Sequence, residues 1–331
     1  MFMGRIAVTD GMDESAVKKL ENAGHEVILE HYTKDKLESG VLGKFDAVVV
    51  RSATKISDKV ITSSTGRNGS LKFIGRAGVG IDNIDIKAAT RSKIAVCNTP
   101  SSSTNAVVEL TIGHLLSCTR NIATGDRSLR DGKWAKKSLR GSELSGKRLG
   151  LIGFGRIAQG VGKIARSLGM SLHAYDPYLP PEIAADEHCT LHDDIDRVFS
   201  LCTHISIHCN YSNETHHLVN QRRLEMMPRI GIDGVECGNH LVNCARGGIV
   251  DEAAVLDALE NGTLSSAALD VFEIEPVENN PLINHPNFHG TPHIGASTVE
   301  AQSRIGEEMV SLILDYFNGK RPKSILNPEV I

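Results

Sequence analysis

A glycine-rich turn between a short apolar strand and a helix most constrains how this chain folds. Residues 147–176 read KRLGLIGFGRIAQGVGKIARSLGMSLHAYD, in which Gly153, Gly155 and Ala158 follow the pattern G-x-G-x-x-G/A. The two glycines permit a tight turn and a close approach of a pyrophosphate, and the small alanine lets the helix pack on the strand. Because free N–H groups and a positive dipole end begin that helix, the segment predicts a dinucleotide-binding βαβ unit.

Asp176 ends the second strand of this unit, about 20 residues beyond the glycine turn. A carboxylate at that place accepts hydrogen bonds from a ribose 2′-hydroxyl and repels a 2′-phosphate, which favours NAD over NADP. A lone glycine pattern also occurs at ordinary turns. The strand before it, the helix after it and the spaced acid together make an NAD site the better interpretation.

Length and composition limit the number of domains, the kinds of partner and the cellular location of the protein. The 331 residues exceed one small domain and predict two. A formal net charge of −4 gives no overall attraction to nucleic acid or to an anionic membrane, and the lack of long apolar runs predicts no membrane span. The N-terminus has no signal-peptide layout, and the seven cysteines have no metal-binding spacing. We therefore expect free thiols, no metal and a cytoplasmic location.

Strand and helix signals alternate along the chain, which predicts parallel sheets with helices on both faces. Apolar runs predict strands at residues 6–8, 27–30, 46–50, 73–74, 94–97, 149–152, 204–208, 241–244, 267–272 and 288–290. Helical spacing predicts helices at residues 13–23, 85–91, 105–121, 191–198, 219–227, 252–260 and 299–317. The helix at 105–121 is apolar nearly all round, so we expect it in a core or against a second subunit. The basic segment 126–140, with Trp134, is either a solvated helix that the Trp anchors or a phosphate-facing patch.

Two arginines in the first part of the chain directly follow apolar strands. Arg51 follows the run 46–50, and Arg76 follows Phe73–Gly75. Ligands of parallel sheets bind at the carboxyl ends of the strands, and guanidinium groups bind anions through paired N–H donors. Either arginine alone could be a solvated surface charge, but the two together favour a shared anion site.

Arg246, Glu275 and His293 each fall at the end of a late strand, at the edge where a nicotinamide is expected. Hydride transfer at a carbinol carbon needs an acceptor for the hydroxyl proton, and histidine titrates in the suitable range. A neighbouring carboxylate would fix its tautomer, and an arginine can grip a substrate carboxylate. Spacing alone leaves open a structural loop histidine, a turn role for Glu275, a surface ion pair for Arg246, and Glu273 as the rival carboxylate.

Seven segments carry a family resemblance that covers nearly the whole chain. They are VVRSATKI (49–56), GRAGVGIDNIDIKAAT (75–90), NTP with VVELTIG (98–113), LGLIGFGRIAQ (149–159), VNCARGGIVDEAAV (242–255), AALDVFEIEP (267–276) and TPHIGAST (291–298). With them the chain resembles the D-isomer-specific 2-hydroxyacid dehydrogenases, and within that family the branch that oxidises phosphoglycerate. The first two segments point to this branch.

The resemblance implies two doubly wound parallel-sheet domains. A Rossmann-type NAD domain at 101–296, with a dimerisation helix at 105–121, would be inserted into a flavodoxin-like substrate domain at 1–100 and 297–331. Arg246 would bind the substrate carboxylate, and Glu275 rather than Glu273 would pair with the acid/base His293. The implied NAD contacts are Gly153, Gly155, Arg156, Ile157, Asp176, Cys209, Cys244, Ala245, Asp270, Gly295, Ala296 and Val79. The implied substrate contacts are Arg51, Ser52, Arg76, Gly78 and Ser103.

The implied activity is the NAD-dependent oxidation of 3-phospho-D-glycerate to 3-phosphooxypyruvate, the first step of serine synthesis, by a homodimer. Arg51, Ser52 and Arg76 would neutralise the phosphate of this small-molecule substrate. Two alternatives stay open. One is the same chemistry on glycerate or hydroxypyruvate, glyoxylate or sulfolactate, and the other is an NAD-sensing binding protein like the corepressors that share this fold.

The chain also departs from the family pattern. His208-Cys-Asn-Tyr211 replaces His-x-Pro-Leu, which predicts a differently shaped wall on the adenosine side. Ser103 stands where an Asn is often found, and residues 229–239 form a longer segment than usual. Because this segment precedes its strand, we expect it at the sheet edge opposite the active site, where it would affect surface or assembly. The chain ends soon after its last helix, so we expect no regulatory module and no serine feedback through one.

Overall fold

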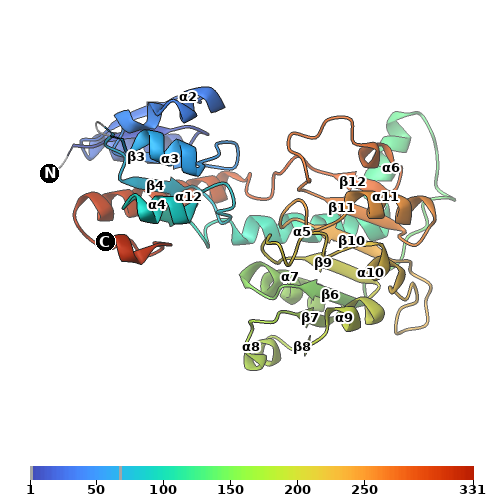
Figure 1. Ribbon diagram of the computed structural model, residues 1–331. Helices are drawn as coiled ribbons and strands as arrows, with labels where there is room; N and C mark the ends of the chain where they lie inside the picture. The colour runs from blue at the N-terminus through green and yellow to red at the C-terminus, as the bar shows by residue number, and fades with distance from the viewer. Residues whose placement is uncertain (1–2, 67–68) are drawn as a thin grey trace. The chain divides into compact units, whose positions relative to one another are not determined.

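The computed structural model describes residues 3–66 and 69–331 and divides into two compact units (Figure 1). Unit 1 consists of Met1–Ser103 and Ala296–Ile331, and unit 2 consists of Thr104–Gly295. The chain therefore changes units at 103/104 and 295/296, where the resemblance implies 100/101 and 296/297. Within the described residues, no helix is both long and apolar enough to cross a membrane.

Unit 1 contains a five-stranded parallel sheet in the order β2-β1-β3-β4-β5, which is the flavodoxin-like order. Its strands are β1 (Arg5–Val8), β2 (Glu26–Leu29), β3 (Ala47–Val50), β4 (Phe73–Arg76) and β5 (Ala95–Asn98). Its helices are α1 (Glu14–Asn22), α2 (Lys34–Glu38), η1 (Val41–Lys44), α3 (Asp58–Ser64), α4 (Ile86–Arg91), α12 (Val299–Phe317) and η3 (Pro328–Val330). The predicted α/β architecture of this part is confirmed.

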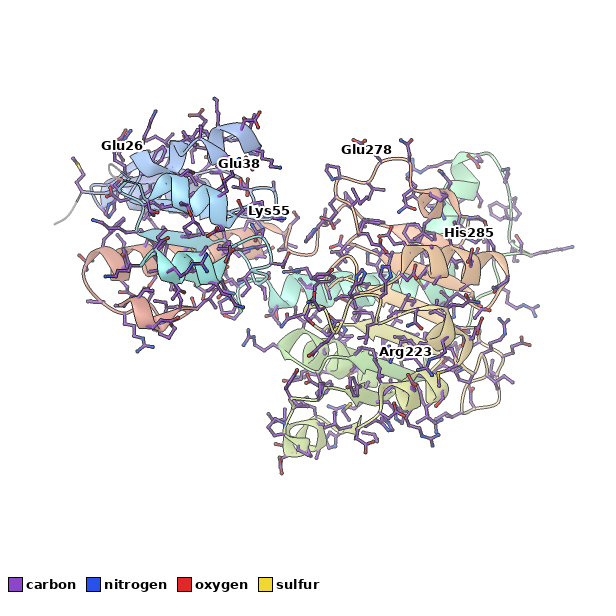
Figure 2. The ribbon with its side chains drawn as sticks, viewed as in Figure 1. Glu26, Glu38, Lys55, Arg223, Glu278 and His285 are labelled. Atoms are coloured by element: carbon purple, nitrogen blue, oxygen red, sulfur yellow. The ribbon has the colours of Figure 1, made fainter. Side chains whose placement is uncertain are left out.

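The central strand β3 shows why the sequence forms this sheet. Its residues Ala-Val-Val-Val are all buried, because helices cover both faces of a parallel sheet. Val48 and Val50 pack on the side of α3 and α4, whereas Ala47 and Val49 pack on the side of α1 and α12. At the sheet edge, Arg5 of β1 and Glu26 of β2 form an exposed ion pair of 2.7 Å (Figure 2).

Unit 2 contains a seven-stranded parallel sheet in the order β12-β11-β10-β9-β6-β7-β8. Its strands are β6 (Arg148–Ile152), β7 (Ser171–Tyr175), β8 (Cys189–His192), β9 (His204–Ile207), β10 (His240–Asn243), β11 (Ser266–Leu269) and β12 (Phe288–Gly290). The order reverses at β6, between β7 and β9, as in the Rossmann arrangement, so the carboxyl end of β6 lies at the switch point where such sheets bind dinucleotides.

Helices cover both faces of this sheet and build two separate cores. One core includes residues of α5 (Thr104–Arg120), α7 (Arg156–Ser167) and α8 (Pro181–Asp186). The other includes residues of α9 (Ile195–Leu201), α10 (Gln221–Glu225), α11 (Glu252–Glu260) and η2 (Pro281–Asn284). Arg223 of α10 forms an ion pair of 2.8 Å with Asp196 of α9 on this second face (Figure 2). The doubly wound fold expected from the alternating signals is thereby confirmed.

Three of the local differences between prediction and structure have a clear physical reason. Residues 191–198 do not form one helix, because β8 ends at His192 and the carboxylate of Asp194 caps a helix that begins at Ile195. The helix expected at 219–227 is shorter, because Val219 pairs with the chain near Val250 in an isolated bridge. Helix α8 is missing from the predictions, since its prolines read as a break. Proline is in fact tolerated in the first turn of a helix, where its missing N–H is not needed.

The apolar helix α5 is buried within unit 2, where it packs with residues of α7 and of the sheet. The exposed apolar side chains lie in the segment that follows α5 rather than in α5 itself. In α6 (Ile122–Arg130), Ile122 is 57% exposed and Leu129 is 59% exposed. Trp134 is 82% exposed, so it does not anchor the segment 126–140 to its own chain.

The longer segment 229–239 lies at the amino end of the sheet, as its position before β10 predicts. Ile230 and Glu236 pair across it in an antiparallel bridge. Its Asp233 accepts a hydrogen bond from the ammonium group of Lys147, a side chain that is 3% exposed and directly precedes β6. The segment thus supplies the carboxylate that a buried lysine needs.

Candidate active site

The glycine turn joins β6 to α7 as the motif predicts. Gly153 has a φ of +85°, and a Cβ atom there would lie 2.7 Å from the Cys209 nitrogen, a distance that real Cβ atoms do not show. Gly155 precedes α7, and a Cβ atom there would meet nothing within 4 Å. The first turn of α7 carries Arg156 and Ile157. Open space before a helix N-terminus fits the pyrophosphate of a dinucleotide.

Asp176 follows β7 and is bound to the glycine turn. Its Oδ2 accepts the Phe154 N–H at 2.9 Å, and its Oδ1 accepts the Tyr178 N–H at 3.0 Å. Each carboxylate oxygen has a further lone pair, so the fixed side chain can also accept ribose hydroxyls. The turn, the helix end and this acid therefore fit NAD.

Two cysteines are among the expected NAD contacts, and Cys209 lies against the glycine turn. Cys209 follows the carboxyl end of β9, and Cys244 follows that of β10. Burial raises the pKa of Cys209 to about 11 and that of Cys244 to about 12. Both therefore carry protonated thiols at neutral pH and act as small apolar side chains. Ala245, the next residue along, donates its N–H to Asn243 at 2.9 Å.

Asp270, which follows β11, is bound to the turn that carries His293. It is 1% exposed. Its Oδ1 accepts the Thr291 hydroxyl at 2.6 Å and the Ile294 N–H at 2.8 Å, and its Oδ2 accepts the Gly295 N–H at 2.8 Å. Its carbonyl also accepts the His293 N–H at 2.8 Å. The structure therefore gives Asp270 a role in shaping this turn, which spacing does not reveal.

His293 and Glu275 form the central pair of the site. The His293 Nδ1 and the Glu275 Oε2 are 2.7 Å apart, and the Phe272 N–H donates to the Glu275 Oε1 at 2.9 Å. Burial opposes ionisation of Glu275, but the bonds from His293 and Phe272 and the charge of Arg246 hold the pKa of its carboxyl below its usual value. With Nδ1 facing a carboxylate, Nε2 is the nitrogen left for a substrate.

Arg246 lies on the loop after β10 and close enough to Glu275 for its charge to act on that carboxylate. Its carbonyl accepts the Asn243 side-chain amide at 2.9 Å, and its Nη1 donates to the Ala245 carbonyl at 2.6 Å. Three strand ends that are separate in sequence thus bring Arg246, Glu275 and His293 into one constellation within unit 2.

In unit 1, Arg51 and Arg76 lie at the same edge of neighbouring strands, because Val50 of β3 is in register with Arg76 of β4. The Asp10 carboxylate accepts the Arg51 N–H at 2.7 Å, and the Asn83 amide donates to the Arg51 carbonyl at 2.7 Å. These contacts hold the backbone of Arg51. The next residue, Ser52, is exposed.

The guanidinium of Arg76 lies over Gly78. A Cβ atom at this position would be 1.6 Å from the Arg76 Nη1, and Gly78 has a φ of +147°, so the position requires glycine. The Val79 carbonyl accepts the Asn98 amide at 2.8 Å. Ser103 is 2% exposed and so has little surface to offer a substrate. Ala296, where unit 1 resumes, accepts a bond from Gln302.

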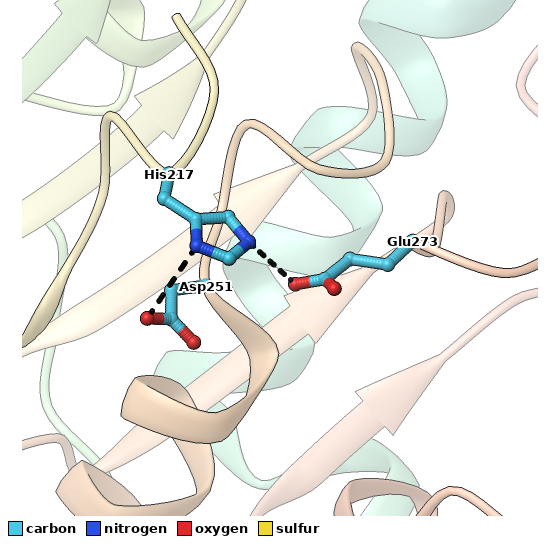
Figure 3. Close-up of side chains that lie close together, drawn as sticks. All are labelled: His217, Asp251 and Glu273. Carbon is cyan, nitrogen blue, oxygen red and sulfur yellow. Dashed lines mark hydrogen bonds and ion pairs between the residues drawn. The ribbon is translucent and has the colours of Figure 1, made fainter.

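A second histidine, which sequence reasoning missed, also lies between carboxylates. One ring nitrogen of His217 and one carboxylate oxygen each of Asp251 and Glu273 lie within 4.8 Å of one another (Figure 3). The His217 Nε2 is 3.1 Å from the Glu273 Oε1, and its Nδ1 is 3.7 Å from the Asp251 Oδ2. The two carboxylates thus face different nitrogens of the ring. Glu273, the rival partner for His293, is bound to His217 instead.

Comparison with known proteins relates this geometry to a family. Residues 112–295, more than half of the chain, match the D-isomer specific 2-hydroxyacid dehydrogenase NAD binding domain. The D-3-phosphoglycerate dehydrogenase of Methanocaldococcus jannaschii is 41% identical over 325 residues, which are 98% of this chain and 60% of that protein. The hydroxypyruvate reductase of Thermotoga maritima is 43% identical over 313 residues, which are 93% of this chain and 97% of that protein. This chain thus spans about three fifths of the phosphoglycerate dehydrogenase.

Solved structures agree in fold over nearly the whole chain. A protein from Thermus thermophilus is 30% identical with a TM-score of 0.85, covering 97% of this chain and 99% of that one. A glyoxylate reductase from Paecilomyes thermophila is 25% identical with a TM-score of 0.86, covering 99% and 100% of the two chains. Together with the family match, these likenesses show that the chain belongs to the D-isomer specific 2-hydroxyacid dehydrogenase family, whose NAD-binding domain it carries at residues 112–295.

Proposed function

We propose that this chain catalyses the NAD-dependent oxidation of 3-phospho-D-glycerate to 3-phosphooxypyruvate. The observation that carries the dehydrogenase chemistry is the 2.7 Å contact between the His293 Nδ1 and the Glu275 Oε2, with Arg246 acting on the same carboxylate. The choice of substrate rests instead on Arg51 and Arg76 at one sheet edge. A histidine held in this way presents Nε2 as a proton acceptor, and the lowered pKa of Glu275 keeps its partner ionised.

The residues have separate tasks in this reaction. Arg246 binds the substrate carboxylate through parallel N–H donors, and the Nε2 of His293 takes the proton of the C2 hydroxyl. The glycine turn and Asp176 would hold NAD, which would supply the hydride acceptor for C2. The Glu275 carboxylate stabilises the imidazolium that forms. In the opposite direction His293 returns its proton to the carbonyl oxygen.

The phosphate is assigned to the arginines of unit 1. Arg51 and Arg76 lie at the carboxyl ends of adjacent strands, and the loop of Arg51 is fixed through its backbone. Two guanidinium groups at one edge are better suited to binding a dianion than to binding a neutral hydroxymethyl group. Similarity to phosphoglycerate dehydrogenases supports this assignment.

A second candidate is the reduction of hydroxypyruvate. The Thermotoga maritima hydroxypyruvate reductase matches this chain in length as well as in sequence. The constellation around His293 serves both substrates equally, because both carry a carboxylate next to the reacting carbon. Only the contribution of Arg51 and Arg76 separates the two functions.

The first test is NADH formation at alkaline pH with 3-phosphoglycerate, run beside glycerate, lactate and 3-sulfolactate, together with NADH consumption by hydroxypyruvate. Turnover confined to the phosphorylated acid would support the proposal. Faster turnover of glycerate and hydroxypyruvate would replace it by the second candidate. Tight NADH binding without any turnover would instead favour an NAD-sensing binding protein.

We also infer that the chain acts as a homodimer in a reducing compartment such as the cytoplasm. The exposed Ile122, Leu129 and Trp134 offer apolar surface that a second copy would cover. All seven cysteines are free, which suits a reducing environment. Light scattering of the wild type and of Trp134→Ser tests the dimer, and a monomeric wild type would contradict it.

A further inference from the structure

The loop that follows β9 is tied to the loop that carries Arg246. The His217 N–H donates to the Gly248 carbonyl at 2.8 Å, and the Val219 N–H donates to the Ile249 carbonyl at 3.1 Å. His217 holds this position with a φ of +48°, a left-handed conformation that non-glycine residues seldom adopt. Its backbone therefore lies directly against the segment that follows Arg246.

The side chain of His217 connects two further loops (Figure 3). Its Nε2 is 3.1 Å from the Glu273 Oε1, and its Nδ1 is 3.7 Å from the Asp251 Oδ2. Asp251 also caps α11, because its Oδ1 accepts the Ala254 N–H at 3.1 Å. Each ring nitrogen of His217 therefore faces a carboxylate on a different loop.

Glu273 lies on the same loop as Glu275 and so links His217 to that loop. Its N–H donates to the Glu252 Oε1 at 2.6 Å, and its Oε1 accepts the Glu252 N–H at 3.2 Å. The segment between Phe272 and Glu275 is closed by the Phe272 N–H, which donates to the Glu275 carboxylate at 2.9 Å. Because Glu273 lies within this closed segment, its fixed position limits where the Glu275 carboxylate can lie.

From these contacts we propose that His217 is a positioning residue for the dehydrogenase reaction. It joins the three loops that follow β9, β10 and β11, and so fixes Arg246 relative to Glu275. Its side chain pairs with Asp251 and Glu273, and it acts through them. This inference rests on the proposed roles of Arg246, Glu275 and His293.

The test is His217→Asn, with His188→Asn as a matched control. His188 is also a histidine with a left-handed backbone, at φ +52°, but it lies between α8 and β8, away from the loops that His217 joins. Asparagine tolerates this conformation, so the change removes the imidazole contacts without adding backbone strain. We expect His217→Asn to lower kcat for hydroxypyruvate or 3-phosphoglycerate about tenfold, as a slightly misplaced catalytic group does. The affinity for NADH should stay unchanged, and His188→Asn should behave as the wild type.

Two further measurements separate positioning from stability. If the chemical step is slowed, the primary deuterium isotope effect on kcat with NADH labelled at the transferred position should rise in His217→Asn. Glu273→Gln should lower kcat in the same direction, and the double variant His217→Asn/Glu273→Gln should lose no more than the stronger single variant, because both changes break one connection.

The outcomes distinguish this inference from the proposed function. If His293→Ala abolishes turnover while His217→Asn matches His188→Asn in kcat and isotope effect, the positioning role is wrong and the function stands. If His293→Ala retains full turnover, the proposed function is wrong, and the positioning role that rests on it is wrong as well. Additive losses in the double variant would also overturn the connection through Glu273.

Discussion

The carboxyl edges of the two sheets hold their charged side chains in different ways. In unit 2, side chains bond to one another, as His293 does to Glu275. In unit 1, the Asp10 carboxylate holds the backbone near Arg51 rather than its guanidinium. Proton transfer needs two groups at a fixed distance, whereas a long cationic side chain can adjust to an anion. We therefore expect changes in unit 2 to lower kcat and changes in unit 1 to raise KM.

The largest effect is expected for His293→Ala, which removes the proton acceptor. General acid–base groups contribute about 10²- to 10⁴-fold to the rate, so kcat should fall by that factor. NADH affinity, measured by fluorescence titration, should remain near the wild-type value because the glycine turn and Asp176 are untouched. Turnover at the wild-type rate would remove His293 from the mechanism.

Glu275→Gln should lower kcat less, by roughly 10- to 100-fold, the range of one charge-assisted hydrogen bond of about 1.5–3 kcal/mol. The amide can still accept a bond from His293, but it does not stabilise the imidazolium. Steady-state kinetics beside Glu278→Gln, a change at an exposed position on the same loop (Figure 2), checks this expectation. Equal kcat values in the two variants would contradict it.

Arg51→Ala should raise KM rather than lower kcat, since it leaves the proton path intact. We expect KM for 3-phosphoglycerate to rise about tenfold, because a charge-assisted contact to the phosphate is lost. KM for hydroxypyruvate and kcat for both substrates should change little. An unchanged KM for the phosphorylated substrate would undo the phosphate assignment.

A smaller effect is expected on stability as the pH falls. The folded-state pKa of Glu275 lies below its ordinary value of 4.5. Its carboxylate therefore stabilises the fold above that pH, and the contribution is lost as the pH falls through the lowered folded-state pKa. Urea unfolding at pH 7 and at pH 4 should show a difference between wild type and Glu275→Gln that shrinks at the lower pH. A difference that grows on acidification would contradict this sign.

The smallest effect is expected for Ser103→Ala. Ser103 is 2% exposed, in contrast to the exposed Ser52, so we expect its loss to change KM by less than about twofold to threefold, below the usual worth of a neutral hydrogen bond. A rise in KM as large as that in Arg51→Ala would restore Ser103 as a direct substrate contact.

The sequence alone determined the sheets and the place of the nucleotide turn. Apolar runs such as Ala47–Val50 are readable because a parallel strand is buried on both faces and shows no polar alternation. Gly153 is readable because the turn needs a positive φ and a close approach to Cys209, which other residues cannot give. Both constraints act over a few neighbouring residues. The sequence was less informative at residues 191–198, where the end of β8 and the start of α9 share one apolar pattern.

Only the tertiary structure decided which side chains meet. Glu273 and Glu275 are both near the end of β11, but one bonds to His217 and the other to His293. Asp270 could have faced a ligand, but three groups of the turn after β12 occupy its carboxylate. Spacing along a chain tells which strand end a residue follows. The direction of its side chain depends on loops from other strands, whose paths are set by packing among residues far apart in the sequence.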